Sequence, residues 1–112
     1  MTIHEIIDAA AKLNEILPTL NAKRTAILHI DIHIPRHCSL YSGNFRSFDE
    51  LKTVIKEKDF SEEVKSTILD NIEKLDFNFE EEYFDEDYHY VSGVVLRTKS
   101  NQEVRVSINL DL

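Results

Sequence analysis

The residues best suited to chemistry form the run His29-x-Asp31-x-His33, followed closely by His37 and Cys38. Residues two apart on a β-strand project from the same face, so two imidazoles and one carboxylate could supply part of a zinc site. Such a site needs three or four ligands, and Pro35 leaves the direction of His37 undetermined. The simpler interpretation is a solvated polar face of a strand. Metal binding by His29, Asp31 and His33 is therefore kept as an alternative function.

Other catalytic chemistry finds little support in the sequence. Gly43 and Gly93 are the two glycines of the chain, so the glycine-rich turns that hold phosphates or dinucleotides are excluded. No serine lies in a nucleophile-elbow context, and the one cysteine, Cys38, is expected to be a passive thiol. The sequence thus predicts no catalytic residue and no cofactor, and we expect the protein not to be an enzyme.

The charge of the chain is concentrated in one segment. Positions 76–88 hold seven of the 21 acidic residues and no Lys or Arg, so they carry most of the net charge of −8. A charge gathered in this way creates a local electrostatic field, which bears on the choice of partner. Five aromatic residues are interleaved with the acids, unlike a disordered acidic tail. They are Phe77, Phe79, Tyr83, Phe84 and Tyr88.

Length and composition predict one domain, residues 1–112, with its own hydrophobic core. The chain is 42% hydrophobic and 30% charged, which is ordinary for a globular protein. No apolar run is long enough to span a bilayer, and the acidic balance disfavours contact with anionic membranes. The first residues lack the pattern of a secretory signal, and a single cysteine cannot form an internal disulfide. We therefore expect a cytoplasmic protein.

The polar and acidic residues must be positioned by helices and strands that the sequence also predicts. A capping box of Thr2 and Glu5 precedes an apolar stripe from Ile3 to Leu17, predicted to be core, and Pro18 marks the end of that helix. Ser47 and Glu50 form a second capping box before a helix. A third helix begins near Ser61 and ends near Leu75.

Alternation of apolar and polar residues predicts the strands. Residues 26–34, 88–98 and 103–110 alternate clearly, and residues 99–102 form a polar hairpin turn between the last two strands. Gly93 indicates a bulge or a close backbone approach, and Ser42-Gly43-Asn44 indicates a turn. Residues 35–46 could be a hairpin or a loop, and the acidic segment could begin as an edge strand with Phe77 and Phe79 facing inward.

The order of these elements, α-β-α-α-β-β-β, predicts the fold class. We expect a single α+β domain with a mostly antiparallel sheet of about four strands and helices packed on one face. The acidic segment then lies between a helix and a strand, so both of its ends are tethered to the core. This narrows the predicted partner-binding surface to Glu80, Glu81, Glu82, Tyr83, Phe84, Asp85, Glu86 and Asp87.

The function expected from this surface is inhibition. Basic residues are scattered, so direct binding of nucleic acid is not expected. Closely spaced carboxylates instead present negative charge much as a nucleic-acid backbone does, and aromatic residues could anchor a protein partner. In charge and size the chain resembles anti-CRISPR proteins, nuclease-immunity proteins and other DNA mimics of phages and bacterial competition loci. The resemblance implies a partner with a basic surface, such as a nuclease. The main alternative is a non-catalytic interaction domain or homodimeric accessory domain.

Overall fold

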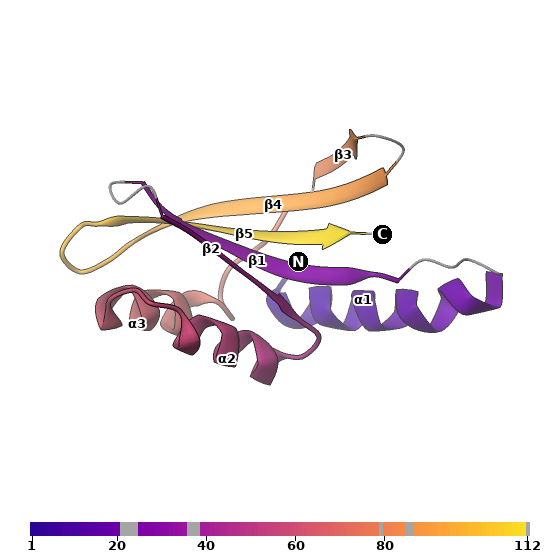
Figure 1. Ribbon diagram of the computed structural model, residues 1–112, viewed down its shortest axis with the longest axis horizontal. Coiled ribbons are helices and arrows are strands. Elements are labelled where there is room, and N and C mark those ends of the chain that lie inside the picture. The colour runs from indigo at the N-terminus through magenta and orange to yellow at the C-terminus, as the bar shows by residue number, and fades with distance from the viewer. Residues whose placement is uncertain (21–24, 36–38, 79, 85–86, 112) are drawn as a thin grey trace.

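The computed structural model describes residues 1–20, 25–35, 39–78, 80–84 and 87–111. Three α-helices and five strands form in this part of the chain (Figure 1). In chain order they are α1 (Ile3–Ile16), a 3₁₀ turn η1 (Leu17–Leu20), β1 (Ile27–Ile34), β2 (Ser39–Phe45), α2 (Phe48–Glu57), α3 (Glu62–Asn71), β3 (Glu80–Phe84), β4 (Asp87–Arg97) and β5 (Glu103–Asp111).

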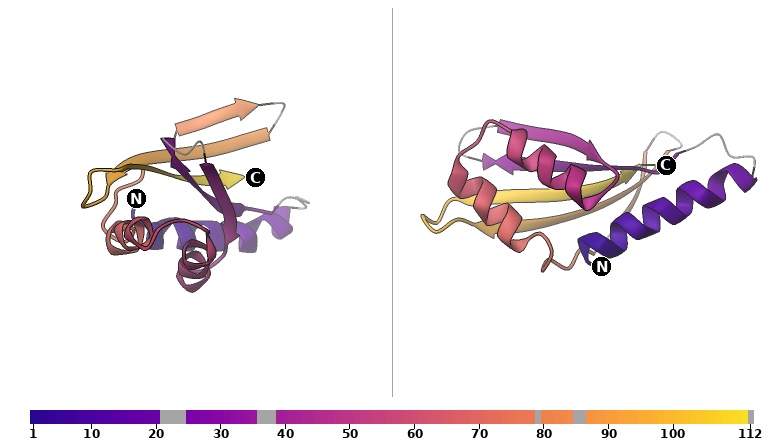
Figure 2. Two further views of the ribbon diagram at one scale, coloured as in Figure 1. Left: turned by 60° about the vertical axis from the view of Figure 1, so that its left-hand side comes forward. Right: turned by 90° about the horizontal axis from the view of Figure 1, so that it is seen from below.

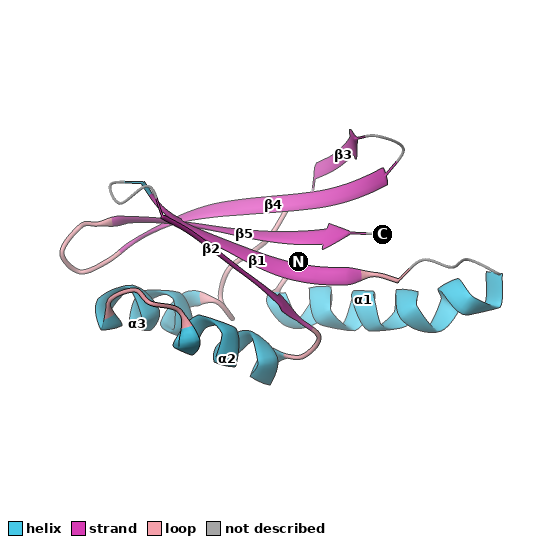
Figure 3. Cartoon of the chain, in the orientation of Figure 1, coloured by secondary structure: helices cyan, strands magenta, loops and turns pink. Residues whose placement is uncertain are grey.

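The five strands form one antiparallel sheet in the order β2-β1-β5-β4-β3. The predicted fold class is confirmed: the helices lie together on one face of the sheet, and no helix of the described residues lies on the other face (Figures 2 and 3). The sequence left open whether residues 35–46 form a hairpin or a loop. Strand β2 settles this, because it pairs with β1 along its whole length from Ser39↔Ile34 to Phe45↔Leu28.

One hydrophobic core lies between the helices and the sheet. The apolar residues of β1 and β5 that alternate along each strand are buried against residues from all three helices. Burying apolar area in this way is the main favourable term in folding. The most deeply buried members include Ile30, Ile32 and Ile108 from the sheet and Ile3, Leu51, Ile55, Ile68 and Ile72 from the helical layer.

Each helix begins at a side chain that caps it. The Thr2 hydroxyl accepts a hydrogen bond from the Glu5 N–H, and the Glu5 carboxylate accepts one from the Thr2 N–H, so the predicted capping box is formed. Ser47 caps α2 by accepting from the Glu50 N–H. The Glu50 carboxylate, however, accepts from the N–H of Arg46, one residue before the cap, and not from the N–H of Ser47. The second predicted capping box is therefore only half formed.

The apolar stripe of α1 is buried over only half of its length, which corrects the prediction that the whole stripe is core. Ile3, Ile6 and Ala10 are buried, whereas Ile16 is 51% exposed and Leu20, in η1, is 69% exposed. The reason is geometric: the C-terminal end of α1 reaches past the start of β1, so no strand lies above it (Figure 1). Pro18 falls within η1, directly after α1 ends.

Neither glycine has the role predicted for it. Pairing of β4 with β5 is continuous through Ser92↔Ile108, Gly93↔Ser107 and Val94↔Val106, so Gly93 marks no bulge. Gly43 lies inside β2 rather than in a turn, and an added Cβ there would meet Val54 Cγ1 at 2.4 Å. The close approach predicted for Gly93 is therefore found at Gly43.

The predicted turn between the last two strands is confirmed. Thr98 and Gln102 close it, and Asn101 adopts a φ of 66°, in the left-handed region that Asn tolerates better than most residues. Glu63 of α3 fastens this turn to the helical layer, since its carboxylate accepts from the N–H and the hydroxyl of Ser100 at 2.8 and 2.7 Å.

Candidate protein-binding surface

The acidic segment forms the outermost hairpin of the sheet. Strand β3 pairs with β4 in the register Glu80↔Val91, Glu81↔Tyr90, Glu82↔His89, Tyr83↔Tyr88 and Phe84↔Asp87. Because β3 is last in the strand order, its other edge pairs with no strand of the described sheet. Figure 1 shows this hairpin on the side of the sheet away from the helices, at its upper edge. The acidic segment is thus an edge strand, as the sequence indicated.

The structure places most of the predicted partner-binding residues on this hairpin. Glu80, Glu81, Glu82, Tyr83 and Phe84 make up β3, and Asp87 is the first residue of β4. Asp85 and Glu86 lie outside the described residues. The strand pairing brings Tyr88 and Tyr90 across from Tyr83 and Glu81. Strand β4 therefore adds aromatic positions beside the acids of β3. These two tyrosines were not among the residues predicted to bind a partner.

The hairpin is tied to the core through Phe77. Its side chain is 1% exposed, and its backbone N–H donates to the Met1 carbonyl at 2.8 Å. The inward direction predicted for Phe77 is confirmed, while Phe79 lies outside the described residues. At the other end, β4 continues for eleven residues into the sheet and pairs with β5 from His89 to Arg97. Both ends of the acidic segment are therefore fixed to folded structure.

A second polar group lies on the helix-free face of the sheet, centred on Asp31. Its carboxylate accepts hydrogen bonds from the Ser42 hydroxyl and from the Asn109 amide, the latter at 2.7 Å. His29 lies between two carboxylates, with Nε2 3.5 Å from Asp31 and Nδ1 3.2 Å from Asp111. This cluster joins β2, β1 and β5 across the face. The Ser42 and Asn109 contacts could not be predicted from the sequence, because they depend on strand register.

The predicted metal-ligand set does not come together. His29 and Asp31 are neighbours, but His33 stands in the row of Leu40 and Arg105 across the sheet. Among the described residues, no group of three or more His, Cys, Asp or Glu side chains could hold a metal ion. His37 and Cys38 lie outside those residues. The local chemistry of Asp31 instead consists of hydrogen bonds that hold strands together.

Two carboxyl groups have lowered pKa values, and both make structural contacts. Hydrogen bonds from Thr2, first from its backbone and then from its side chain, lower the pKa of Glu5. Hydrogen bonds from the Ser100 hydroxyl and then from its N–H lower the pKa of Glu63. Each hydrogen bond favours the charged form of the acid. These groups cap a helix and hold a turn, which explains both shifts without any catalytic role.

Comparison with known proteins adds no assignment: no family model, curated protein or solved structure matches the chain. Within the described residues, no helix is both long enough and apolar enough to cross a membrane. The acidic hairpin is the feature in which charge, aromatic residues and an open sheet edge coincide.

Proposed function

We propose that the protein is a non-catalytic inhibitor whose β3–β4 hairpin occupies the basic nucleic-acid-binding groove of a nuclease or related enzyme. The observation that carries the proposal is the placement of the acidic run in a paired edge strand rather than in a tail. A paired strand holds its backbone at fixed spacing, so its charges have a defined arrangement. In this proposal the protein acts in the cytoplasm and needs no cofactor.

The spacing of the strand suits mimicry of a nucleic acid. Glu80, Glu81 and Glu82 are consecutive in β3. An antiparallel strand rises about 3.4 Å per residue, which is close to the rise per phosphate along one strand of DNA. Pairing with β4 places Asp87 beside the end of the same strand. Successive residues of a strand lie on opposite faces, so positions 80 and 82 share one face about 6.8 Å apart. A basic groove would therefore meet acidic positions on that face at about every second phosphate step of its natural ligand.

Aromatic residues in the hairpin would supply binding affinity that charge alone does not. Charge mainly speeds encounter and excludes wrong partners, whereas buried aromatic side chains contribute most of the affinity in many interfaces. Tyr83 is paired with Tyr88 in the register of the two strands, and Phe84 is paired with Asp87. The proposal gives the acids the role of selecting a basic surface and the aromatic residues the role of anchoring to it.

The test compares two variants that lose the same number of charges. The first neutralises Glu80, Glu81, Glu82, Asp85, Glu86 and Asp87 to Gln or Asn. The matched control neutralises six exposed acids elsewhere, namely Asp8, Glu15, Asp49, Glu57, Asp59 and Asp70. Both are measured by biolayer interferometry against a panel of purified nucleases with basic grooves, with and without a competing 20-base-pair duplex.

We expect the wild-type protein and the control to bind a member of the panel in competition with the duplex. Their affinity should fall about tenfold or more between roughly 50 and 200 mM salt, because screening weakens contacts between exposed charges. The hairpin variant should lose binding while keeping the same circular dichroism spectrum. Equal binding by the two variants, or binding that the duplex does not displace, would show that the hairpin is not a nucleic-acid mimic.

A second candidate is a homodimeric accessory domain, favoured by the helix-free face of the sheet. There Leu40 and Val95, which are 66% and 57% exposed, flank His33 and Arg105 in one row across four strands. Contiguous apolar patches mark protein contacts, and Leu40 and Val95 would contribute two positions to such a patch. Sedimentation velocity distinguishes the candidates. A dimer of this acidic chain should strengthen as salt screens repulsion between the copies, whereas binding to a basic partner should weaken.

A further inference from the structure

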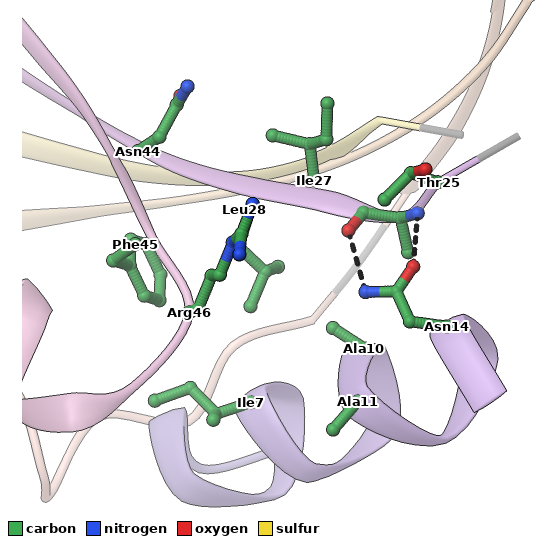
Figure 4. Close-up of a pocket in the computed structure, with 11 residues that line it drawn as sticks. Ile7, Ala10, Ala11, Asn14, Thr25, Ile27, Leu28, Asn44, Phe45 and Arg46 are labelled. Carbon is green, nitrogen blue, oxygen red and sulfur yellow. Dashed lines mark hydrogen bonds between the residues drawn. The ribbon is translucent and has the colours of Figure 1, made fainter.

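A cleft of about 520 Å³ opens between α1 and the adjoining ends of β1 and β2. Its volume is within the range of small-molecule sites, roughly 300–1,000 Å³. Figure 4 shows α1 along one side of the cleft and the start of β1 along the other, with the end of β2 beside them. In the strand order, β5 lies between the cleft, at β1 and β2, and the acidic β3–β4 hairpin, so the two surfaces are distinct.

The floor of the cleft is apolar, because alanine, leucine and phenylalanine side chains line it. Ala10 and Ala26 leave space where larger side chains would fill it, and Leu28 and Phe45 complete the floor. The polar backbone of this wall is satisfied: the Asn14 amide donates to the Ala26 carbonyl at 3.0 Å, and the Asn14 oxygen accepts from the Ala26 N–H at 2.7 Å. Figure 4 shows these two bonds at one end of the cleft. An apolar ligand would thus leave no backbone group of Ala26 unpaired.

The rim of the cleft favours an anion. None of the described lining residues is Asp or Glu, in a chain that has 21 of them, and Arg46 is the one charged residue of that lining. Arg46 is exposed, and its guanidinium makes no ion pair with any described residue. Thr25 and Asn44 also line the cleft, but the Asn44 side chain points away from α1 (Figure 4). A guanidinium in this position can bind a carboxylate through two parallel hydrogen bonds.

From these features we infer that the cleft binds a small molecule with an apolar body and one carboxylate group. The apolar part lies over Ala10, Leu28 and Phe45, and the carboxylate pairs with Arg46. The probe for this class is 4-phenylbutyrate, compared with 4-phenylbutanol, which has the same apolar body without the charge. A ligand of about twelve heavy atoms that gains roughly 0.3 kcal/mol per atom has a Kd on the order of millimolar.

The experiment is a titration of the ¹⁵N-labelled protein with each compound, followed by two-dimensional NMR. Phenylbutyrate should shift the amide signals of residues 10, 11, 26–28 and 44–46, and phenylbutanol should bind about tenfold more weakly. The Arg46→Gln substitution should weaken the binding of phenylbutyrate about tenfold and leave the binding of phenylbutanol unchanged. The control, Arg105→Gln, removes another exposed arginine charge, one that pairs with Glu103, and should bind both compounds as the wild type does.

The space in the cleft is tested separately with Ala10→Val. The larger side chain should fill part of the cleft and weaken the binding of both compounds. Its fold is checked in the same NMR spectra, and the Arg46→Gln result stands without it, since Arg46 is exposed. The inference is overturned if 10 mM phenylbutyrate leaves the lining signals unmoved. Equal affinity of the two compounds, or equal effects of Arg46→Gln and Arg105→Gln, would overturn it as well.

Discussion

The contact between Gly43 and Val54 allows a quantitative test of how β2 packs on α2. A Cβ added at Gly43 would lie 2.4 Å from Val54 Cγ1 and 3.3 Å from Cγ2. Real carbon atoms in contact are about 3.5–4.0 Å apart, so Val54 would have to move. It cannot move freely, because valine strongly prefers one rotamer in a helix and because Leu51 and Ile55 fix α2 in the core.

The expected cost follows from two opposing terms. Overpacking of this kind costs about 1–3 kcal/mol. Replacing glycine by alanine also restricts the unfolded chain, which stabilises the folded protein by about 0.4–1 kcal/mol. Gly43→Ala should therefore lower the free energy of unfolding by about 1–2 kcal/mol. Gly93→Ala is the matched control, since its nearest neighbour would be the Val106 carbonyl oxygen at 4.0 Å, so only the stabilising term applies.

The assay is urea unfolding followed by circular dichroism, with midpoints and slopes fitted for each variant. Gly93→Ala should unfold at a higher urea concentration than the wild type and Gly43→Ala at a lower one. Adding Val54→Ala to Gly43→Ala should remove the overlap, so the double variant should lose less than the sum of the single losses. If Gly43→Ala proves as stable as Gly93→Ala, the packing of α2 on β2 described above is wrong.

Three further predictions concern other contacts. Asp31→Ala should lower the free energy of unfolding by about 2 kcal/mol, because it leaves the Asn109 amide, 7% exposed, without its acceptor; the loss should shrink when Asn109→Ala is also present, as measured by urea unfolding. Glu63 has a lowered pKa, so its contribution to stability is complete above its ordinary value of 4.5 and is lost as the pH falls through the lowered value. Glu63→Gln should flatten the fall in stability as the pH drops below about 4.5 in a series of urea melts, and an unchanged slope would contradict this. Along α1, Ile6→Ala should cost about 2–5 kcal/mol and Ile16→Ala well under 1 kcal/mol in thermal melts, because only Ile6 is buried.

Local signals in the sequence predicted the elements well because they depend on neighbouring residues. The capping box at Thr2, the alternation in residues 27–34 and the polar turn before Glu103 all act within a few positions, and each is present in the structure. The edge-strand character of the acidic segment was predicted in the same way, from alternation before Tyr83.

Features that depend on distant residues could not be predicted. Whether Ile16 is buried depends on where β1 begins above α1, and nothing in the apolar stripe itself records that position. The close approach was predicted at Gly93 rather than at Gly43 for the same reason, since a close approach is defined by the partner element, here α2. The cluster around Asp31 likewise requires the register of β1 with β2 and β5.

The central position of β5 determines how late the sheet can be completed during folding. β5 is the last of the five strands to be synthesised, yet it lies between β1 and β4. Before it is in place, the sheet can exist only as two separate hairpins, β1–β2 and β3–β4. Joining them brings together Asp31 and Asn109, which are 78 positions apart, and such distant contacts form slowly. Until β5 is available, the nascent chain therefore exposes the edges of β1 and β4 that β5 later covers, in addition to the outer edges of β2 and β3, and that interval is when it is most open to aggregation.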